Sequence, residues 1–171
     1  MKCMYIVAAC LALAGCVSRP DQVTPVTPFK SELYLGKWYE IARLDHRFER
    51  GLSQVTAEYS MRPDGGIKVI NRGFDAANSA WKQSEGKAYF VGASDTAYLK
   101  VSFFGPFYGS YIVFDLDPQY RVAMVSGPDT SYLWILARTP AIDAAVKARL
   151  VAKAKSLGYA TEKLIWVEQK A

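Results

Sequence analysis

Apolar and polar residues alternate in short stretches along most of the chain after residue 35, and turn residues separate the stretches. In the stretch 98–104, for example, Leu99, Val101 and Phe103 alternate with polar neighbours. A period of two is typical of a strand that buries one face. The same kind of pattern predicts eight strands, at residues 36–45, 53–61, 67–74, 81–91, 98–104, 110–115, 120–126 and 132–138. Because a meander of eight strands closes naturally on itself, the predicted fold class is all-β, an eight-stranded antiparallel up-and-down β-barrel.

The first predicted strand is apolar on both faces. Trp38 shares one face with Glu40, while Ile41 and Arg43 lie on the other. Such a strand is usually covered on both sides, here by the barrel interior and by a packed outer element. Gly36 allows a sharp turn before Trp38, whose ring is large enough to plug one end of a small barrel. Glu40 is then an inward charge near that end, and we expect it to pair with an Arg or Tyr in a structural role.

Residues 139–158 carry a helical pattern. Thr139 suits the N-cap, Pro140 suits the first helical position, and Gly158 ends the pattern. We expect this C-terminal helix to pack on the outside of the barrel with a solvated basic face; a helix lying on a membrane surface is the alternative. A last short strand is predicted at 164–167. The apolar stripe of the helix consists of Ile142, Val146, Leu150 and Leu157.

The first 15 residues have the layout of a secretion signal. One lysine precedes an apolar run at 4–14, which is too short to span a bilayer. The run leads into Leu13-Ala14-Gly15-Cys16, which resembles the bacterial lipoprotein cleavage box. That resemblance implies that Cys16 is the lipidated first residue of the mature chain, and that Val17 favours export to the outer membrane. Several acyl chains together hold a protein firmly, because each buried CH₂ contributes about 0.8 kcal/mol.

The chain is thus expected to have three parts. Residues 1–15 form the signal peptide, residues 16–30 the lipidated N-terminus with a Pro-rich tether, and residues 31–171 a single globular domain. Fully extended, the tether spans at most about 45 Å. Residues 31–35 are predicted to form one helical turn capped by Ser31.

Composition and charge narrow the class of function. The net charge of +5 is mild, and acidic residues are interspersed with basic ones, which gives no support to a nucleic-acid partner. The three cysteines, Cys3, Cys10 and Cys16, all lie in the first 16 residues, so no thiol chemistry is expected in the globular part. His46 is the single histidine, and neither a metal nor a cofactor is expected. His46 beside Asp45 leaves a lipid isomerase or hydrolase as an alternative, although no Gly-x-Ser-x-Gly elbow accompanies it.

Three short motifs together resemble the signatures of the lipocalin family. They are Gly36-Lys37-Trp38 on the first strand, Asp117 with Tyr120 after the sixth, and Arg138 at the end of the eighth. The resemblance extends over residues 29–167 and is closest to the bacterial outer-membrane lipocalins. It implies a lipocalin domain at 31–171 that is lipid-anchored to the outer membrane, faces the periplasm, and holds a small ligand inside its barrel.

The directions of the strands divide the barrel into a closed end and a mouth. If the first strand runs toward the mouth, Trp38 and Arg138 meet at the closed end. An arginine over an indole ring contributes roughly 0.5–2 kcal/mol. Gly36, Trp38 and Arg138 are therefore the predicted structural signature. The same directions place the loops 46–52, 75–80, 104–110 and 127–131 at the mouth.

Two groups of residues are the candidate ligand contacts. The inward strand faces carry Tyr59, Ala88, Phe90, Leu99, Val101, Phe103, Tyr111 and Val113. The mouth loops carry Arg47, Phe48, Arg50, Phe107 and Tyr108. An apolar cavity with arginines at its rim suits an amphiphile with its acyl tail inside and an anionic head at the rim. The favoured hypothesis is a membrane-anchored carrier or store of fatty acids or lysophospholipids. A binder of another small hydrophobic or anionic ligand is the alternative, and a homodimer stays open.

Overall fold

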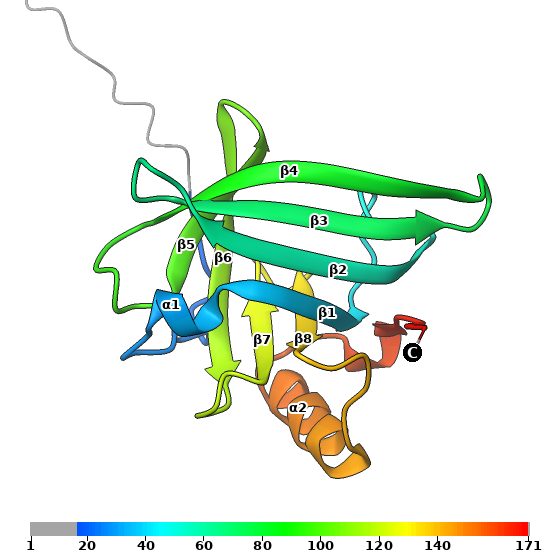
Figure 1. The fold of residues 1–171 in the computed structure, drawn as a ribbon. Helices are drawn as coiled ribbons and strands as arrows, with labels where there is room; N and C mark the ends of the chain where they lie inside the picture. Colours follow the sequence, from blue (N-terminus) through cyan, green and yellow to red (C-terminus); the bar gives the residue numbers. More distant parts are fainter. Residues whose placement is uncertain (1–16, 171) are drawn as a thin grey trace, which may run out of the picture.

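The computed structural model describes residues 17–170, and its main element is one β-sheet closed into a barrel (Figure 1). Neighbouring strands pair antiparallel in chain order, and β1 pairs with both β8 and β2, which closes the barrel. The predicted eight-stranded antiparallel up-and-down barrel is therefore confirmed. Its strands are β1 (Gly36–Arg43), β2 (Leu52–Met61), β3 (Ile67–Asp75), β4 (Ala80–Phe90), β5 (Tyr98–Phe104), β6 (Phe107–Leu116), β7 (Val122–Ser126) and β8 (Leu133–Ala137).

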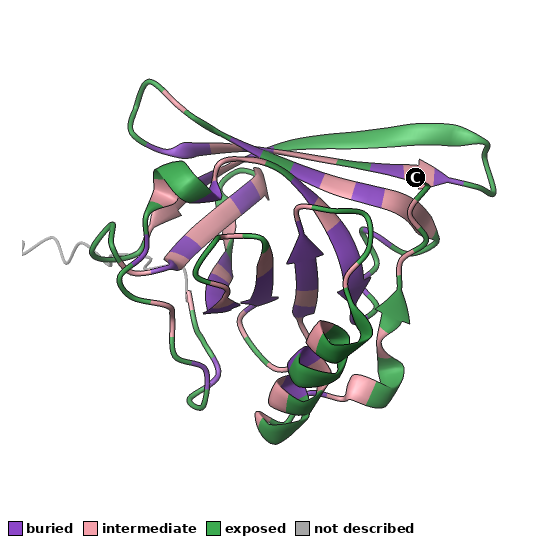
Figure 2. Cartoon of the chain, turned by 60° about the horizontal axis from the view of Figure 1, so that its bottom comes forward, coloured by how far each residue is buried: buried purple, intermediate pink, exposed green. Residues whose placement is uncertain are grey.

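Side-chain alternation along the strands separates two hydrophobic clusters. The interior cluster includes Trp38 and Tyr59. The outer cluster includes Ile112 and Ile135, together with residues of the helix α2 (Ala144–Ser156). Figure 2 shows α2 against the barrel with its outer surface largely exposed. The predicted position of the C-terminal helix, outside the barrel, is confirmed.

The helix α2 begins later than the sequence predicts. The expected start at Thr139 is wrong, because the N-cap is Asp143 and the first helical residue is Ala144. The hydroxyl of Thr139 donates to the carbonyl oxygen of Ala141 at 2.7 Å, so it stabilises a local turn instead of capping a helix. The predicted end agrees with the structure, since Gly158 has a φ of +82°, the left-handed conformation that terminates helices.

The basic side chains of α2 remain largely solvent-exposed, as predicted, and three of them also contact neighbouring elements. Arg149 and Lys153 lie 3.2 and 2.6 Å from the carboxylate of Asp115 on β6. The ammonium of Lys147 lies 3.5 Å from the centre of the Trp166 ring. These contacts hold the helix on the barrel wall, which disfavours the alternative of a membrane-surface helix. No helix within residues 17–170 is long and apolar enough to cross a bilayer.

The N-terminal segment 17–30 packs against the barrel, so the expectation that it is an extended, semi-rigid tether is corrected. Val23 is completely buried in the outer cluster, and the N–H of Val26 donates to the carbonyl of Val113 at 2.9 Å. Phe29 is buried in the interior cluster at the closed end. A Pro-rich chain has few backbone hydrogen bonds of its own, and its extended shape is as suitable for docking on a wall as for a spacer.

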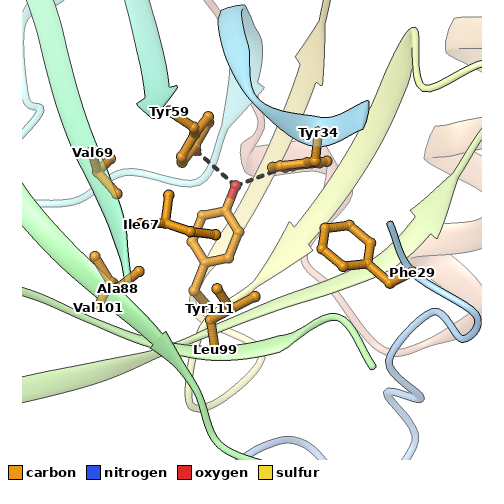
Figure 3. Close-up of a pocket in the computed structure, with 9 residues that line it drawn as sticks. All are labelled: Phe29, Tyr34, Tyr59, Ile67, Val69, Ala88, Leu99, Val101 and Tyr111. Atoms are coloured by element: carbon orange, nitrogen blue, oxygen red, sulfur yellow. Dashed lines mark hydrogen bonds between the residues drawn. The ribbon is translucent and has the colours of Figure 1, made fainter. Parts of the chain in front are cut away.

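The closed end is covered by the short helix α1 (Ser31–Tyr34). Tyr34 is its buried residue, and it points into the barrel (Figure 3). The predicted helical turn is confirmed, but the N-cap position falls on Lys30, and no side chain caps the helix. Ser31 is therefore the first helical residue rather than the cap.

The C-terminal segment completes the barrel wall on the mouth side. After α2, a 3₁₀ turn (Thr161–Lys163) leads to β9 (Ile165–Trp166), which pairs with β1 where β2 has diverged from it. The side-chain amide of Gln169 donates to the carbonyls of Glu40 and Val55, at 2.8 and 2.9 Å. This segment therefore joins β1 to β2, and the short strand predicted at 164–167 is confirmed.

Candidate functional site

A small cavity lies inside the barrel near its closed end (Figure 3). Its volume is about 20 Å³, which is room for roughly one water molecule. An acyl chain needs more space, so it has to displace side chains or occupy the interior nearer the mouth. The wall is built entirely from apolar and aromatic residues: Phe29, Tyr34, Tyr59, Ile67, Val69, Ala88, Leu99, Val101 and Tyr111.

The predicted inward residues all belong to the barrel interior. Phe90, Phe103 and Val113 lie in or against the interior cluster without lining the cavity. The other five line the cavity, namely Tyr59, Ala88, Leu99, Val101 and Tyr111. Strand alternation therefore identified the inner face, while it could not indicate where along the barrel the space remains.

Four wall residues were not among the predicted contacts. Ile67 and Val69 alternate on β3 and pair with Ala88 and Tyr59, so the strand register contains the signal that identifies them. The other two, Phe29 and Tyr34, come from the segment before the barrel. No periodic pattern in that segment marks a residue as inward.

Three tyrosines in the cavity wall form a chain of hydroxyl groups. The Tyr111 hydroxyl lies 2.7 Å from the hydroxyls of both Tyr34 and Tyr59 (Figure 3). Burial raises the pKa of all three phenols, so they stay neutral. Three O–H donors serve two mutual hydrogen bonds, which leaves one donor for a water or for an acceptor on a ligand.

The closed end contains the predicted signature residues in contact. The guanidinium of Arg138 lies 4.0 Å from the centre of the Trp38 ring, so the predicted meeting of these two residues is confirmed. Gly36 has a φ of +90°, and a Cβ there would lie 3.5 Å from the Arg138 guanidinium. Glycine therefore meets a conformational requirement at this position, while a Cβ would make only an ordinary contact with Arg138. Arg138 also donates to the carbonyls of Leu33, Leu35 and Lys37 at 2.8–2.9 Å.

The loop between β1 and β2 places its two predicted arginines in different settings. Arg50 donates to the Asp45 carboxylate at 2.9 Å, and this hydrogen bond lowers the pKa of Asp45. Arg47 is exposed and forms no ion pair with any residue in the described part of the chain. Phe48 stacks on the His46 ring at a centroid distance of 5.3 Å. Arg47 is thus the better placed of the two to meet an anionic head group.

The hairpin between β5 and β6 carries the remaining predicted mouth residues. Phe107 is at the tip, where it pairs across the hairpin with Phe104. Tyr108 lies instead on the outer face of the barrel, with Lys100 above its ring at 5.1 Å and Tyr89 beside it. The expectation that Tyr108 belongs to the rim is therefore corrected, because the alternation along β6 turns it away from the mouth.

A buried charge cluster between the cavity and the mouth was only partly expected. The Arg43 guanidinium donates to the Glu40 carboxylate at 2.6 Å, and Trp134 donates to the Glu49 carboxylate at 3.0 Å. Arg43 also donates to the backbone carbonyl of Glu49 at 2.8 Å. Burial raises the pKa of both glutamates, since two carboxyl groups share a single guanidinium away from water. The predicted pairing of Glu40 with an arginine is confirmed.

The sequence predicts Arg43 on the opposite face from Glu40, and this is wrong. The pairing of β1 with β8 shifts register between Glu40 and Ala42, which is a β-bulge. The extra residue turns Arg43 inward, onto the same side as Glu40. Bulges have no reliable signal in a single sequence, so the alternation rule alone could not have placed Arg43.

His46 lies in an aromatic stack. Its ring is parallel to Phe48 and to Tyr132, with centroids 5.3 and 4.6 Å away. Burial lowers its pKa, and Nε2 has no hydrogen-bond partner among residues 17–170. Asp45 is bound to Arg50 and so does not orient the imidazole for catalysis. Across the same residues, no group of three or more His, Cys, Asp or Glu side chains is arranged to hold a metal ion.

The comparisons with known proteins agree with this geometry. Residues 29–169 match the lipocalin-like domain family, so the chain belongs to the lipocalins. It is 53% identical over 171 residues to the outer membrane lipoprotein Blc of Vibrio cholerae, with 99% of this chain and 100% of that protein covered. The outer membrane lipoprotein Blc of Escherichia coli K12 is 55% identical, with 99% and 98% covered. Insecticyanin from the tobacco hornworm has the same fold, with a TM-score of 0.70 at 22% identity over 89% of this chain and 86% of that one.

Proposed function

We propose that this protein is a membrane-anchored lipid-binding protein that carries or stores fatty acids or lysophospholipids in the bacterial cell envelope. The observation that carries the proposal is the apolar cavity inside a closed lipocalin barrel. Apolar and aromatic side chains surround the deep end, where an acyl chain gains from leaving water, and the tyrosine hydroxyls in that wall are hydrogen-bonded to one another. Buried charged groups lie farther toward the mouth, at Glu40, Arg43 and Glu49.

The anchor and the location belong to the same proposal. Two relatives that cover nearly the whole chain are named outer membrane lipoproteins. Cys16 and the predicted signal peptide 1–15 lie outside the described residues, so lipidation of Cys16 rests on the cleavage-box resemblance. With that anchor, the barrel faces the periplasm from the outer membrane.

A chain-length series tests lipid binding. Each additional CH₂ buried in the barrel contributes at most about 0.8 kcal/mol, so lengthening a fatty acid by two carbons should tighten its dissociation constant several-fold until the interior is full. Quenching of the protein's tryptophan fluorescence measures the affinity, because Trp38 and Trp134 lie in or against the interior cluster. A response that is flat with chain length would contradict a lipid carrier.

The rim residues provide a second arm of the experiment. Arg47→Ala should weaken binding of an anionic fatty acid more than binding of a neutral monoacylglycerol of equal chain length, because a rim charge acts only on the head group. Arg50→Ala is the matched control, since Asp45 already occupies its guanidinium. Recovery of chemically altered lipid, with turnover abolished in His46→Ala, would favour an enzyme instead.

A further inference from the structure

The described chain begins beside the mouth of the barrel. The hydroxyl of Ser18 donates to the carbonyl of Pro128, at 3.3 Å, in the loop that joins β7 to β8. The hydroxyl of Ser110 donates to the carbonyl of Ser18, and that of Tyr98 donates to the carbonyl of Val17 at 2.8 Å. The first described residues, Val17 and Ser18, therefore lie against the barrel beside this rim.

The attachment to the wall extends toward the closed end. Val23 is completely buried in the outer cluster, to which α2 also contributes, and Arg19 donates to its carbonyl. Farther along, Val26 and Phe29 are tied to the wall by backbone hydrogen bonds at 2.9 and 2.7 Å. A docked segment cannot act as a long spacer. The N-terminal attachment point therefore fixes which end of the barrel lies near an anchor.

The most exposed apolar side chains lie at the same end. Among the described residues, the three large hydrophobic side chains with the highest exposure are Phe107 at 79%, Phe104 at 77% and Phe48 at 62%. Phe104 and Phe107 form the tip of the β5–β6 hairpin, which projects past the edge of β4 (Figure 1). Ser110, which binds Ser18, follows Phe107 by three residues, or about 10 Å of strand.

The charges near this rim nearly cancel. Arg50 forms an ion pair with Asp45, and Lys82 forms one with Asp75. The exposed side chains of Arg47 and Asp129 carry opposite charges. A surface that binds through electrostatics would show an excess of one sign. Two exposed phenylalanines paired across a hairpin are instead typical of contact with hydrocarbon.

We propose that the mouth of the barrel faces the membrane that carries the lipid anchor, with Phe104 and Phe107 inserted into that leaflet. The proposal rests on the anchor at Cys16 in the proposed function. It adds the orientation of the barrel and the route of the ligand: an acyl chain passes between the bilayer and the barrel interior at a common boundary, without crossing bulk water.

The orientation is tested with a fluorescent label on the mature lipidated protein in vesicles of phosphatidylethanolamine and phosphatidylglycerol. Phe107→Cys places the label on the hairpin tip, and Met61→Cys is the matched control, at an exposed position at the closed-end terminus of β2. The lipidated chain from Cys16 onward has no other cysteine. Spin-labelled phospholipids in the bilayer should quench the label at Phe107→Cys several-fold more than the label at Met61→Cys. Equal quenching, or stronger quenching at Met61→Cys, would overturn the proposal.

A second measurement follows the ligand. Phe104→Ser, at the exposed hairpin residue that is not among the candidate ligand contacts, should slow the transfer of a fluorescent fatty acid from the vesicles several-fold and leave its affinity in solution unchanged. The slower transfer should depend little on salt. Leu33→Ser with Met61→Ser, at the closed end, should change neither quantity. An unchanged transfer rate in the first variant would overturn the proposed route.

The outcomes separate the two proposals. Absence of fatty-acid binding by the wild-type protein in solution would refute the lipid carrier, while the quenching would still decide the orientation. Release of the wild-type protein from washed vesicles would refute the anchor, and the orientation with it. Efficient cross-linking between two copies through Phe107→Cys, without quenching, would show that the hairpin contacts a second copy instead of lipid.

Discussion

At the scale of single residues, the closed end of the barrel depends on Arg138. Its guanidinium covers the Trp38 ring at 4.0 Å and saturates carbonyl groups at the end of α1 and the start of β1. Because α1 is only one turn long, no following turn supplies N–H groups to bind these carbonyls. Arg138 therefore supplies the missing hydrogen-bond donors and also packs on the Trp38 ring, which fills the closed end of the barrel.

Truncation of this pair should be costly and coupled. Trp38→Ala should lower the free energy of unfolding by roughly 3–5 kcal/mol, and Arg138→Ala by roughly 1–3 kcal/mol, in urea titrations. The double variant should lose clearly less than the sum, because each residue is the other's partner. Arg72 and Trp81 provide a control pair, since they stack at 4.3 Å on the exposed part of the sheet. Additive losses for Trp38 and Arg138 would mean that their contact contributes nothing.

The buried glutamates predict a dependence of stability on pH. Burial raises the pKa of Glu40 from an ordinary 4.5 to about 8, so the folded protein retains a proton that the unfolded chain releases. Stability should therefore fall as the pH rises from the lower value to the higher one. Glu40→Gln should flatten this decline in thermal or urea unfolding measured across that range. Glu58→Gln, at an exposed position of β2, should leave the decline unchanged, and an unaltered curve in Glu40→Gln would contradict the assignment.

At the scale of elements, segment 17–30 is a part of the folded domain. Val23→Ala should lower the free energy of unfolding by about 2 kcal/mol, because Val23 is completely buried in the outer cluster. It should also speed hydrogen exchange at the N–H of Val26. Thr24→Ala, next to it but exposed, should change neither quantity. Equal results for the two variants would indicate that the segment is a free tether after all.

The elements also show which features the sequence can and cannot predict. The strands follow from alternation, because one face of each is buried and the other is not. The docking of 17–30 does not, since a Pro-rich composition indicates an extended chain without indicating a surface for it. The start of α2 was misplaced because Thr139 and Pro140 are as favourable in a turn as at a helix start. Arg43 was misplaced because the bulge after Glu40 reverses the side on which it lies.

At the scale of the whole molecule, the barrel interior changes from apolar at the closed end to charged toward the mouth. The cavity wall is hydrocarbon apart from three tyrosine hydroxyls. Two hydrogen bonds among these hydroxyls use two of their three O–H donors. The buried cluster of Glu40, Arg43 and Glu49 lies farther along β1 and its loop. In the proposed function, this polarity gradient would orient an amphiphile with its tail toward Trp38 and its polar end toward the mouth.

The depth of the interior should therefore determine the preferred acyl length. Leu99 lines the cavity of about 20 Å³, and Leu99→Ala removes carbon atoms directly from its wall. The optimum of a fatty-acid series should shift upward by about two carbons, since the truncation makes room for roughly three carbon atoms at the deep end. Leu133→Ala is the matched control, because Leu133 is equally buried but belongs to the outer cluster. Both variants should lose roughly 2–5 kcal/mol of unfolding free energy, yet only the first should change the chain-length optimum measured by fluorescence titration. An identical optimum in both would place the end of the acyl chain elsewhere than at the Leu99 cavity.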